Sequence, residues 1–529
     1  MVGGRVILAK GFVASGTVRL PGANIIGPLQ CEQAELNSND WHGYALLADG
    51  MTVGGGLAFT DMRITRGAIS MAGAKITGDL RWNNVHLDGI DGKRNALIAN
   101  SVKVGGDLAI NKLFTTAGAI RLPGARITGR LTCSASTLKG RDGDRRALLA
   151  DGLIASGAWF GSVRTTSGCI RMIGAEITRD LRCQGVRLKG VDENGRALVA
   201  NRIKVGGSII IGSSPTIYED PGSIADGALS FKSARIGGSL ELKPEKLAGG
   251  QGAPGQQKVA LDLSGAQIAH ELEWAPASAV TGMVILEDTK VALLKDNFEL
   301  EPKGRWPSAC DGRLLLDGFT YNGICDEPKA PPKERLEWIG SPYKPVRKNK
   351  QRIFTTQPYE QLAAVYRRAG QDTEARNVCI ARRRDLRRYG DLTGYRKVGN
   401  WLLDISIRYG YRTWRAVAAL AILYVAAVVI FLVAQHHPGA LIPVMASPAL
   451  HPVPDAAHCT SSYPCFYPAA YAIDTVIPII NVHQATFWGP NGHAPLGHAL
   501  AAFTWISIVA GWALTTLAVA GYTGLVRRD

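Results

Sequence analysis

The sequence predicts a mainly β protein, in which a parallel right-handed β-solenoid is followed by a C-terminal helical hairpin and two transmembrane helices. Three observations lead to this prediction. A phrase repeats along the first half of the chain, its apolar residues alternate between glycine-bounded corners, and two long uncharged apolar runs lie near the C-terminus. The chain has 529 residues, of which 46% are hydrophobic, so it exceeds one compact domain and is too apolar for general disorder.

The repeated phrase recurs about every 50 residues. One copy reads GAIRLPGARITGRLTC, and a second phrase of the type VKVGGDLAI alternates with it, so each unit holds two strand-rich turns. Strands at a fixed spacing with tight corners and no helical period are typical of a β-solenoid, which we place at residues 1–327. The four clear copies begin at Gly16, Gly67, Gly118 and Gly168, and weaker copies begin at Gly227 and Val259.

Stacked turns would align several cysteine and tryptophan residues in one column. Such a column could be a row of metal-binding or redox thiols, or an inward apolar ladder. Tryptophan replaces cysteine within the column, and buried cysteine packs as a small hydrophobe, so we expect the apolar ladder. The aligned residues are Cys31, Trp82, Cys133, Cys183 and Trp274.

Each unit also carries a polar loop at the same place, within residues 37–44, 88–95, 139–146 and 189–196. Some of these loops contain Asp-Gly pairs, which occur in calcium sites, but they lack the spaced carboxylates of such a site. We therefore expect ordinary turns that form a charged row along one edge of the solenoid.

The short glycine-bounded strands, such as ITGDL and VGGDL, resemble those of bactofilins and, more distantly, of pentapeptide-repeat solenoids. The whole chain resembles a set of bacterial membrane proteins that join such a solenoid to a two-helix C-terminal anchor. Members of this set are often labelled membrane-associated oxidoreductases, so the resemblance implies that activity as an alternative function. The matching phrases are LLLDGFTYNGI at 314–324, QPYEQLAAVYRRAGQDTEARNVCIARRRDLRR at 357–388, YGYRTWRA at 409–416 and YAIDTVIPIINV at 471–482.

The first residues already have the strand pattern of the solenoid, with Val6 and Val18 in strand-like runs. An uncovered parallel turn exposes backbone groups and core side chains, which favours pairing with another chain. Bactofilins associate end to end, so the resemblance points the same way. We expect a homodimer through the N-terminal end of the solenoid.

The composition changes after the repeats. Residues 328–356 are rich in proline and lysine and are predicted to be a cover and linker. Residues 357–415 are predicted to be a helical cap and a basic juxtamembrane segment, with a helical hairpin broken at Gly370. The hairpin would cap the last solenoid turn, and the alternative is a peptide-binding hairpin.

The segment 330–415 contains 20 Lys and Arg residues against 8 Asp and Glu residues. Its basic residues lie directly before an apolar run, so anionic lipid headgroups are the expected partner, and nucleic acid is not. Topogenic charge alone is the alternative role. The candidate headgroup-binding residues are Arg382, Arg383, Arg384, Arg387, Arg388, Arg396, Lys397, Arg408, Arg412 and Arg415.

The two apolar runs, 416–434 and 499–521, are each long enough to span a bilayer as a helix. The loop between them, 435–498, contains no Lys or Arg and is therefore predicted to be extracytoplasmic. The tail 522–529 and the N-terminus should be cytoplasmic, which makes the chain a two-pass protein of the bacterial inner membrane.

The 435–498 loop contains three further features. A short apolar segment, 468–488, is broken by Pro478 and is a candidate re-entrant helix. Asp474 within it is a candidate intramembrane acid. Cys459 and Cys465 are a candidate disulfide, because this face of the membrane could be oxidising. The loop is also rich in histidine, but the spacings match no metal-ligand pattern.

The leading functional hypothesis is a non-enzymatic, membrane-anchored cytoplasmic scaffold with an unknown protein partner. The sequence predicts no cofactor and no metal site, and it contains no dinucleotide fingerprint, no CxxC and no catalytic motif. A first alternative is a channel- or transporter-like membrane module that the solenoid regulates. The second is the oxidoreductase that the family resemblance implies.

Overall fold

The computed structural model describes two compact units, Met1–Val378 and Cys379–Asp529. The description covers the chain except residues 10, 38–42, 113, 214–221, 251–256, 297–304, 308–313, 327–331, 341–342, 344–353, 407, 409–413, 446–455, 459–462 and 524–529.

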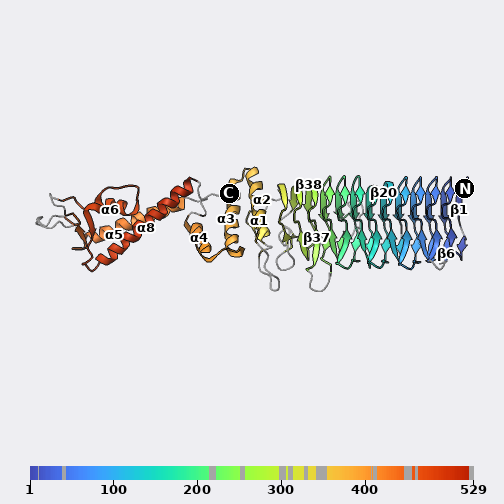
Figure 1. The fold of residues 1–529 in the computed structure, drawn as a ribbon, viewed down its shortest axis with the longest axis horizontal. Helices are drawn as coiled ribbons and strands as arrows, with labels where there is room; N and C mark the ends of the chain where they lie inside the picture. Colours follow the sequence, from blue (N-terminus) through green and yellow to red (C-terminus); the bar gives the residue numbers. More distant parts are fainter. Residues whose placement is uncertain are drawn as a thin grey trace. The chain divides into compact units, whose positions relative to one another are not determined.

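The first unit is a stack of parallel strands arranged in three sheets of 20, 10 and 12 strands (Figure 1). One turn contributes β15 (Asn95–Ile98) to the 12-stranded sheet, β16 (Lys103–Val104) and β17 (Leu108–Asn111) to the 20-stranded sheet, and β18 (Thr115–Thr116) to the 10-stranded sheet. The next turn repeats this order with β19 (Ala119–Arg121), β20 (Arg126–Ser134) and β21 (Thr137–Leu138). The predicted solenoid of stacked parallel strands is thus present, with two turns in each sequence repeat.

The inward column that contains Cys31, Trp82 and Cys133 runs along the 20-stranded sheet. The register pairs Cys31 with Phe59, Phe59 with Trp82, and Ile110 with Cys133, so each predicted residue alternates with a large apolar one. All of these side chains are buried, and burial raises the pKa of the Cys31 and Cys133 thiols to about 12. The column is therefore an apolar ladder of neutral thiols and rings.

Three of the polar loops, 88–95, 139–146 and 189–196, are each closed by a buried aspartate. In the loop 139–146, the Asp142 carboxylate accepts the backbone N–H groups of Asp144 and Arg146 and the Nε–H of the Arg146 guanidinium. Asp192 makes the same bonds in its loop, and Asp91 accepts two backbone N–H groups and the side-chain amide of Asn95. These carboxylates are committed to the turn, which agrees with the prediction of ordinary turns.

The glycines of the repeat allow the turns to approach closely. A Cβ atom on Gly105 would lie 2.1 Å from the Thr77 carbonyl oxygen, and one on Gly206 would lie 2.2 Å from that of Thr178. Both contacts are shorter than any van der Waals separation, so only glycine fits where consecutive turns meet at these corners.

The last strand of the solenoid, β42 (Thr320–Asp326), is followed by two helices that cover this end of the stack, α1 (Pro332–Gly340) and α2 (Gln357–Arg368) (Figure 1). The Gln357 side-chain amide donates to the Phe319 carbonyl oxygen and accepts the Gly318 N–H, so it satisfies backbone groups at the edge of the last described turn. The cap therefore begins with α1, inside the predicted cover and linker.

A buried ion pair fixes α1 to the solenoid. Asp296 follows Trp274 in the inward column, and the Arg335 guanidinium donates to both of its carboxylate oxygens. The Trp306 indole N–H donates to the same carboxylate at 2.8 Å, and Trp306 lies between Trp274 and Trp338 at centroid distances of 4.4 and 5.5 Å. The apolar column thus ends in an acid that pairs with the cap.

The second unit contains most of the remaining helices. The chain runs from α3 (Asp372–Tyr389), which begins in the first unit, to α4 (Gly394–Ser406) and α5 (Trp414–Gln435). The strand β43 (Leu441–Pro443) pairs antiparallel with β44 (Trp488–Pro490). Two short helices, α6 (Pro468–Val476) and α7 (Gln484–Phe487), precede β44, and α8 (Gly497–Tyr522) follows it.

Candidate membrane interface

Two helices of the second unit are long and apolar enough to cross a membrane. They are α5, with a mean hydropathy of 3.0, and the Gly497–Ala520 part of α8, with a mean hydropathy of 1.7. Each extends the predicted run, 416–434 or 499–521, by one or two residues at either end. Large apolar side chains such as Ile422 and Val509 are exposed on both helices, as expected for surfaces that contact lipid.

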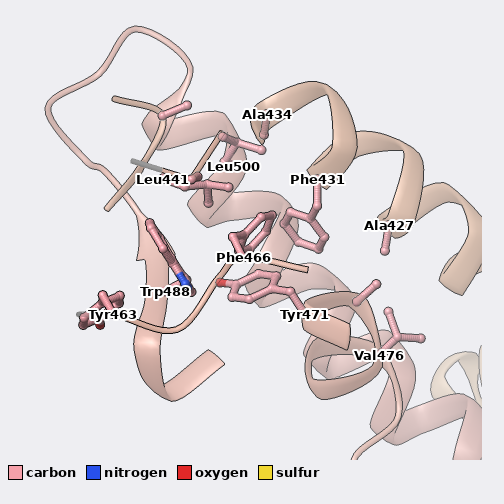
Figure 2. Close-up of a cluster of buried hydrophobic side chains, with 13 residues drawn as sticks. Ala427, Phe431, Ala434, Leu441, Tyr463, Phe466, Tyr471, Val476, Trp488 and Leu500 are labelled. Carbon is pink, nitrogen blue, oxygen red and sulfur yellow. The ribbon is translucent and has the colours of Figure 1, made fainter. Parts of the chain in front are cut away.

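The sides of α5 and α8 that face away from the exposed apolar residues pack into a buried cluster rich in aromatic side chains (Figure 2). Phe431 on α5 contacts Tyr471 on α6 edge to face at a centroid distance of 4.7 Å, and it lies 5.9 Å from Phe503 on α8. Trp488 on β44 is buried beside Phe466, and its indole N–H donates to the Pro464 carbonyl oxygen at 3.0 Å. The cluster joins α5, α6 and α8 into one packed body.

The predicted re-entrant segment 468–488 forms two short helices instead of one. α6 has 9 residues and ends at Val476, and Pro478, two residues later, prevents its continuation. At about 1.5 Å per residue it is too short to cross a bilayer. Its last turn packs closely on α8, because a Cβ atom on Gly511 would lie 2.0 Å from the Val476 carbonyl oxygen.

Asp474 closes the chain between α6 and α7. Its two carboxylate oxygens accept the backbone N–H groups of Val482 and Ala485, the second at 3.0 Å. These bonds give the candidate intramembrane acid a structural role at the start of α7. The carboxylate satisfies donors that a helix start would otherwise leave unpaired.

Of the other loop residues, Cys465 is disulfide-bonded. Its predicted partner, Cys459, lies outside the described residues. Within the described part of the chain, no three His, Cys, Asp or Glu side chains are placed so that they could hold a metal ion.

α4 packs on α3 through a charged contact. Arg384 and Arg387 on α3 form ion pairs with Asp404 on α4, at 2.9 and 3.4 Å. Burial raises the pKa of the Asp404 carboxyl, but the two guanidinium groups outweigh that effect and hold the pKa below its ordinary value. Gly399, Asn400 and Leu403, on the same side of α4 as Asp404, are half-buried.

The other face of α4 is apolar and exposed. Tyr395 is 73% exposed, Val398 59%, Trp401 51% and Leu402 55%, and their spacing places them on one side of the helix. Arg396 and Lys397 are also exposed on this helix. The sequence pattern contained this signal, but the prediction assigned the region only as a basic segment and missed the amphipathic helix.

The ten candidate headgroup-binding residues separate into groups. Arg384 and Arg387 bind Asp404, and Arg382, Arg383 and Arg408 have interactions within the protein. Arg412 lies outside the described residues. Four of the ten are exposed or half-buried and form no ion pair with a described residue: Arg388, Arg396, Lys397 and, in the first turn of α5, Arg415.

Comparison of the chain with protein-family models, with curated proteins and with solved structures gives no match.

Proposed function

We propose that this chain is a membrane-anchored cytoplasmic scaffold, in which α5 and α8 cross the bacterial inner membrane and the solenoid presents a long surface to protein partners. The observation that carries the proposal is α4, a helix with an exposed apolar face and exposed cations, which ends eight residues before α5 begins, between Ser406 and Trp414. The solenoid is proposed to be right-handed, because parallel crossovers have that hand in about 98% of cases.

The exposed face of α4 matches the chemistry of a bilayer interface. Tryptophan and tyrosine concentrate at that depth, where one side of the ring is apolar and the other is wet, and α4 presents Trp401 and Tyr395. Arg388, Arg396 and Lys397 add about 1 kcal/mol each near an anionic surface. The ion pairs to Asp404 hold the opposite face of α4 on α3.

The charge distribution supports the proposed topology. The 330–415 segment has an excess of basic residues, whereas the loop 435–498 has no Lys or Arg. Basic segments that flank a membrane helix stay on the cytoplasmic side. Both termini are therefore proposed to be cytoplasmic.

Two labelling experiments test this proposal in intact cells. In a background without Cys459 and Cys465, a cysteine at Asn491 should react with an impermeant thiol reagent from outside, and a cysteine at Asp144 should not. The reverse pattern would overturn the cytoplasmic placement of the solenoid.

The α4 contact can be tested in bilayers of stated composition. A nitroxide at residue 402, on the exposed face, should be more accessible to oxygen than to a polar relaxation agent when the full chain is in nanodiscs with anionic lipid. A nitroxide at residue 400, on the α3 side, is the matched control. Equal accessibility of the two sites to the polar agent would contradict an interfacial helix.

The proposal includes a homodimer through the turn that holds β1 (Val6–Leu8). Val6 and Leu8 pair with Leu29 and Cys31 in the inward column, yet they are only half-buried, and Ile7 is 48% exposed. A second copy would cover this edge, which the resemblance to bactofilins also suggests. Val6→Glu with Val18→Glu should convert a dimer to a monomer in light scattering, and a monomeric wild-type protein would contradict the dimer.

A further inference from the structure

The outward face of the 20-stranded sheet carries one exposed tryptophan, Trp159, on β23 (Ile154–Gly161). It is 38% exposed, whereas Trp82 and Trp274 in the interior are buried. Its register neighbours are Thr132 and Arg182, and the same position holds Ala58 and Ala109 in other turns. An indole at this position adds nothing to the core, because the side chain points away from it.

The Trp159 ring lies on the sheet over Gly161. A Cβ atom on Gly161 would lie 3.0, 3.1 and 3.4 Å from three atoms of the indole. Neighbouring turns carry side chains here, Ser134 and Gln184. The missing side chain leaves room for the ring, and no described aromatic or guanidinium group stacks on it.

Two arginines beside the ring also depart from the repeat. The corner sequence is Thr-Gly-Asp-Leu at residues 77–80, but Arg130 replaces its aspartate in one turn and Arg179 replaces its glycine in another. The aliphatic part of the Arg130 side chain packs over Gly157, where a Cβ atom would lie 3.4 Å from the Arg130 Cγ atom. Neither guanidinium forms a hydrogen bond or ion pair with a described residue.

Two acids lie at this cluster, Asp107 and Asp180, and neither forms an ion pair with Arg130 or Arg179. The Asp107 carboxylate accepts the backbone N–H of Arg130 at 2.8 Å. The Asp180 carboxylate binds the Arg182 guanidinium at 2.9 Å and accepts the Ser208 N–H at 3.0 Å. Burial raises the pKa of the Asp180 carboxyl, but these two donors and the positive charges of Arg182 and Arg179 outweigh that effect and keep the pKa below its ordinary value. Three arginines and two hydrogen-bonded carboxylates leave a net positive charge.

Trp159, the three arginines and Asp180 line one surface pocket of about 370 Å³. That volume lies in the range of small-molecule sites. A solenoid repeats the residues that its fold requires, so departures from the repeat at solvent-exposed positions are not explained by packing. Here Arg130, Trp159 and Arg179 depart from the repeat together, at one place.

We propose that this pocket binds a small phosphorylated ring compound, a nucleotide or a sugar phosphate, whose ring stacks on Trp159 and whose phosphate is bound by Arg130, Arg179 and Arg182. Aromatic faces stack on nucleobases and on the apolar faces of sugar rings. Guanidinium groups bind phosphate through two parallel N–H donors. The proposal does not depend on the membrane anchor or on the side of the membrane that the solenoid faces.

Binding to the purified full chain in detergent can be measured by calorimetry with four probes: adenosine monophosphate, glucose 6-phosphate, adenosine and inorganic phosphate. At least one of the two phosphorylated rings should bind saturably, and about tenfold or more tightly than adenosine or phosphate alone. The ring that binds identifies the source of the ligand. Absence of saturable binding by both phosphorylated rings, or equal binding of inorganic phosphate, would overturn the proposal.

The variants use residues that the repeat itself contains, so the fold should be retained. Trp159→Ala introduces the residue of the equivalent positions 58 and 109, Arg130→Asp restores the corner aspartate, and Arg179→Gly restores the corner glycine. Each should weaken binding by about tenfold or more while the melting temperature stays unchanged. Arg81→Ala is the matched control, because Arg81 pairs with Asp79 as Arg182 pairs with Asp180, but in a turn without tryptophan. Wild-type binding in the three variants, or equal loss in the control, would refute the site.

Discussion

The regular turns of the solenoid and its C-terminal cap are stabilised in different ways. In the regular turns, Ile127 pairs with Val104 on one side and Ala155 on the other, and the same arrangement recurs along the ladder. In the cap, Arg335 and Asp296 make a contact that occurs once, buried among tryptophan rings. The repeated contacts are apolar and recur from turn to turn, whereas the cap depends on a buried ion pair that Trp306 supports with one further hydrogen bond.

In a repeat protein, stability is therefore spread evenly over the regular turns, whereas the end of the stack depends on a few specific contacts. The stability of stacked turns is a sum of similar nearest-neighbour terms, so each turn contributes a comparable share. The cap must instead satisfy the open edge of the last turn, and Gln357 does so with its side-chain amide. Four predictions test the comparison, from the largest expected effect to the smallest.

The largest effect is expected inside a regular turn. Ile127→Asp should destabilise the protein by about 4 kcal/mol or more, because Ile127 is 3% exposed and the new carboxylate would have no partner. Chemical denaturation followed by circular dichroism measures the change. Arg126→Ala, at the adjacent exposed position, should cost less than about 0.5 kcal/mol. Equal effects would show that the inward and outward positions have been exchanged.

In the cap, Arg335→Ala should cost about 3–5 kcal/mol, because it leaves the buried Asp296 carboxylate without its cation. The double variant Asp296→Leu with Arg335→Leu removes both charges and should lose less than the single variant, as the denaturation midpoints will show. If the double variant is less stable than Arg335→Ala, the expectation is wrong. The ion pair would then stabilise the cap by more than the cost of leaving the Asp296 carboxylate unpaired.

The polar loops of the regular turns should show an intermediate effect. Asp142→Ala removes the acceptor of two backbone N–H groups and of Arg146, and should cost about 1–3 kcal/mol. Asp144→Ala in the same loop is the control, since that side chain is 70% exposed, and its loss should stay below about 1 kcal/mol. A comparable loss in both variants would mean that the loop depends on its overall charge and not on the buried turn.

The smallest effect compares cysteines in the ladder with one in the last strand. Burial raises the pKa of the Cys133 and Cys183 thiols to about 12, so they stay protonated and unreactive well above pH 8, whereas Cys325 on β42 is exposed. Alkylation of the folded protein at pH 8, followed by mass spectrometry, should modify Cys325 and spare the other two until denaturant is added. Rapid alkylation of Cys133 in the folded protein would place it outside the ladder.

The sequence predicted the parts of the fold that repeat or that have a strong composition. The Cys31, Trp82 and Cys133 column was predicted because a fixed spacing places equivalent residues on the same sheet position. The two apolar helices were predicted because length and hydropathy alone decide whether a segment can cross a bilayer. The exposed face of α4 was within reach of the same reasoning, through the spacing of Tyr395, Val398 and Leu402.

The contacts that occur once could not be predicted in this way. Arg335 lies in a segment rich in proline and lysine, and nothing in its neighbourhood indicates a partner 39 residues earlier. Asp474 is an acidic residue in an apolar segment, which is the pattern of an intramembrane acid. Only the folded chain brings the N–H groups of Val482 and Ala485 to its carboxylate. The pocket beside Trp159 likewise needs three turns to be stacked before its arginines meet the ring.

The sequence by itself therefore determined the stacked parallel turns, the alternation of inward and outward residues and the two apolar helices, because each follows from local periodicity or composition. The tertiary structure alone decided that the turns form three sheets, that α1 covers the last turn, that α4 leaves an apolar face exposed, and that Trp159 lies among three arginines. These features depend on side chains far apart in the chain, and a periodic pattern carries no information about pairs that occur only once.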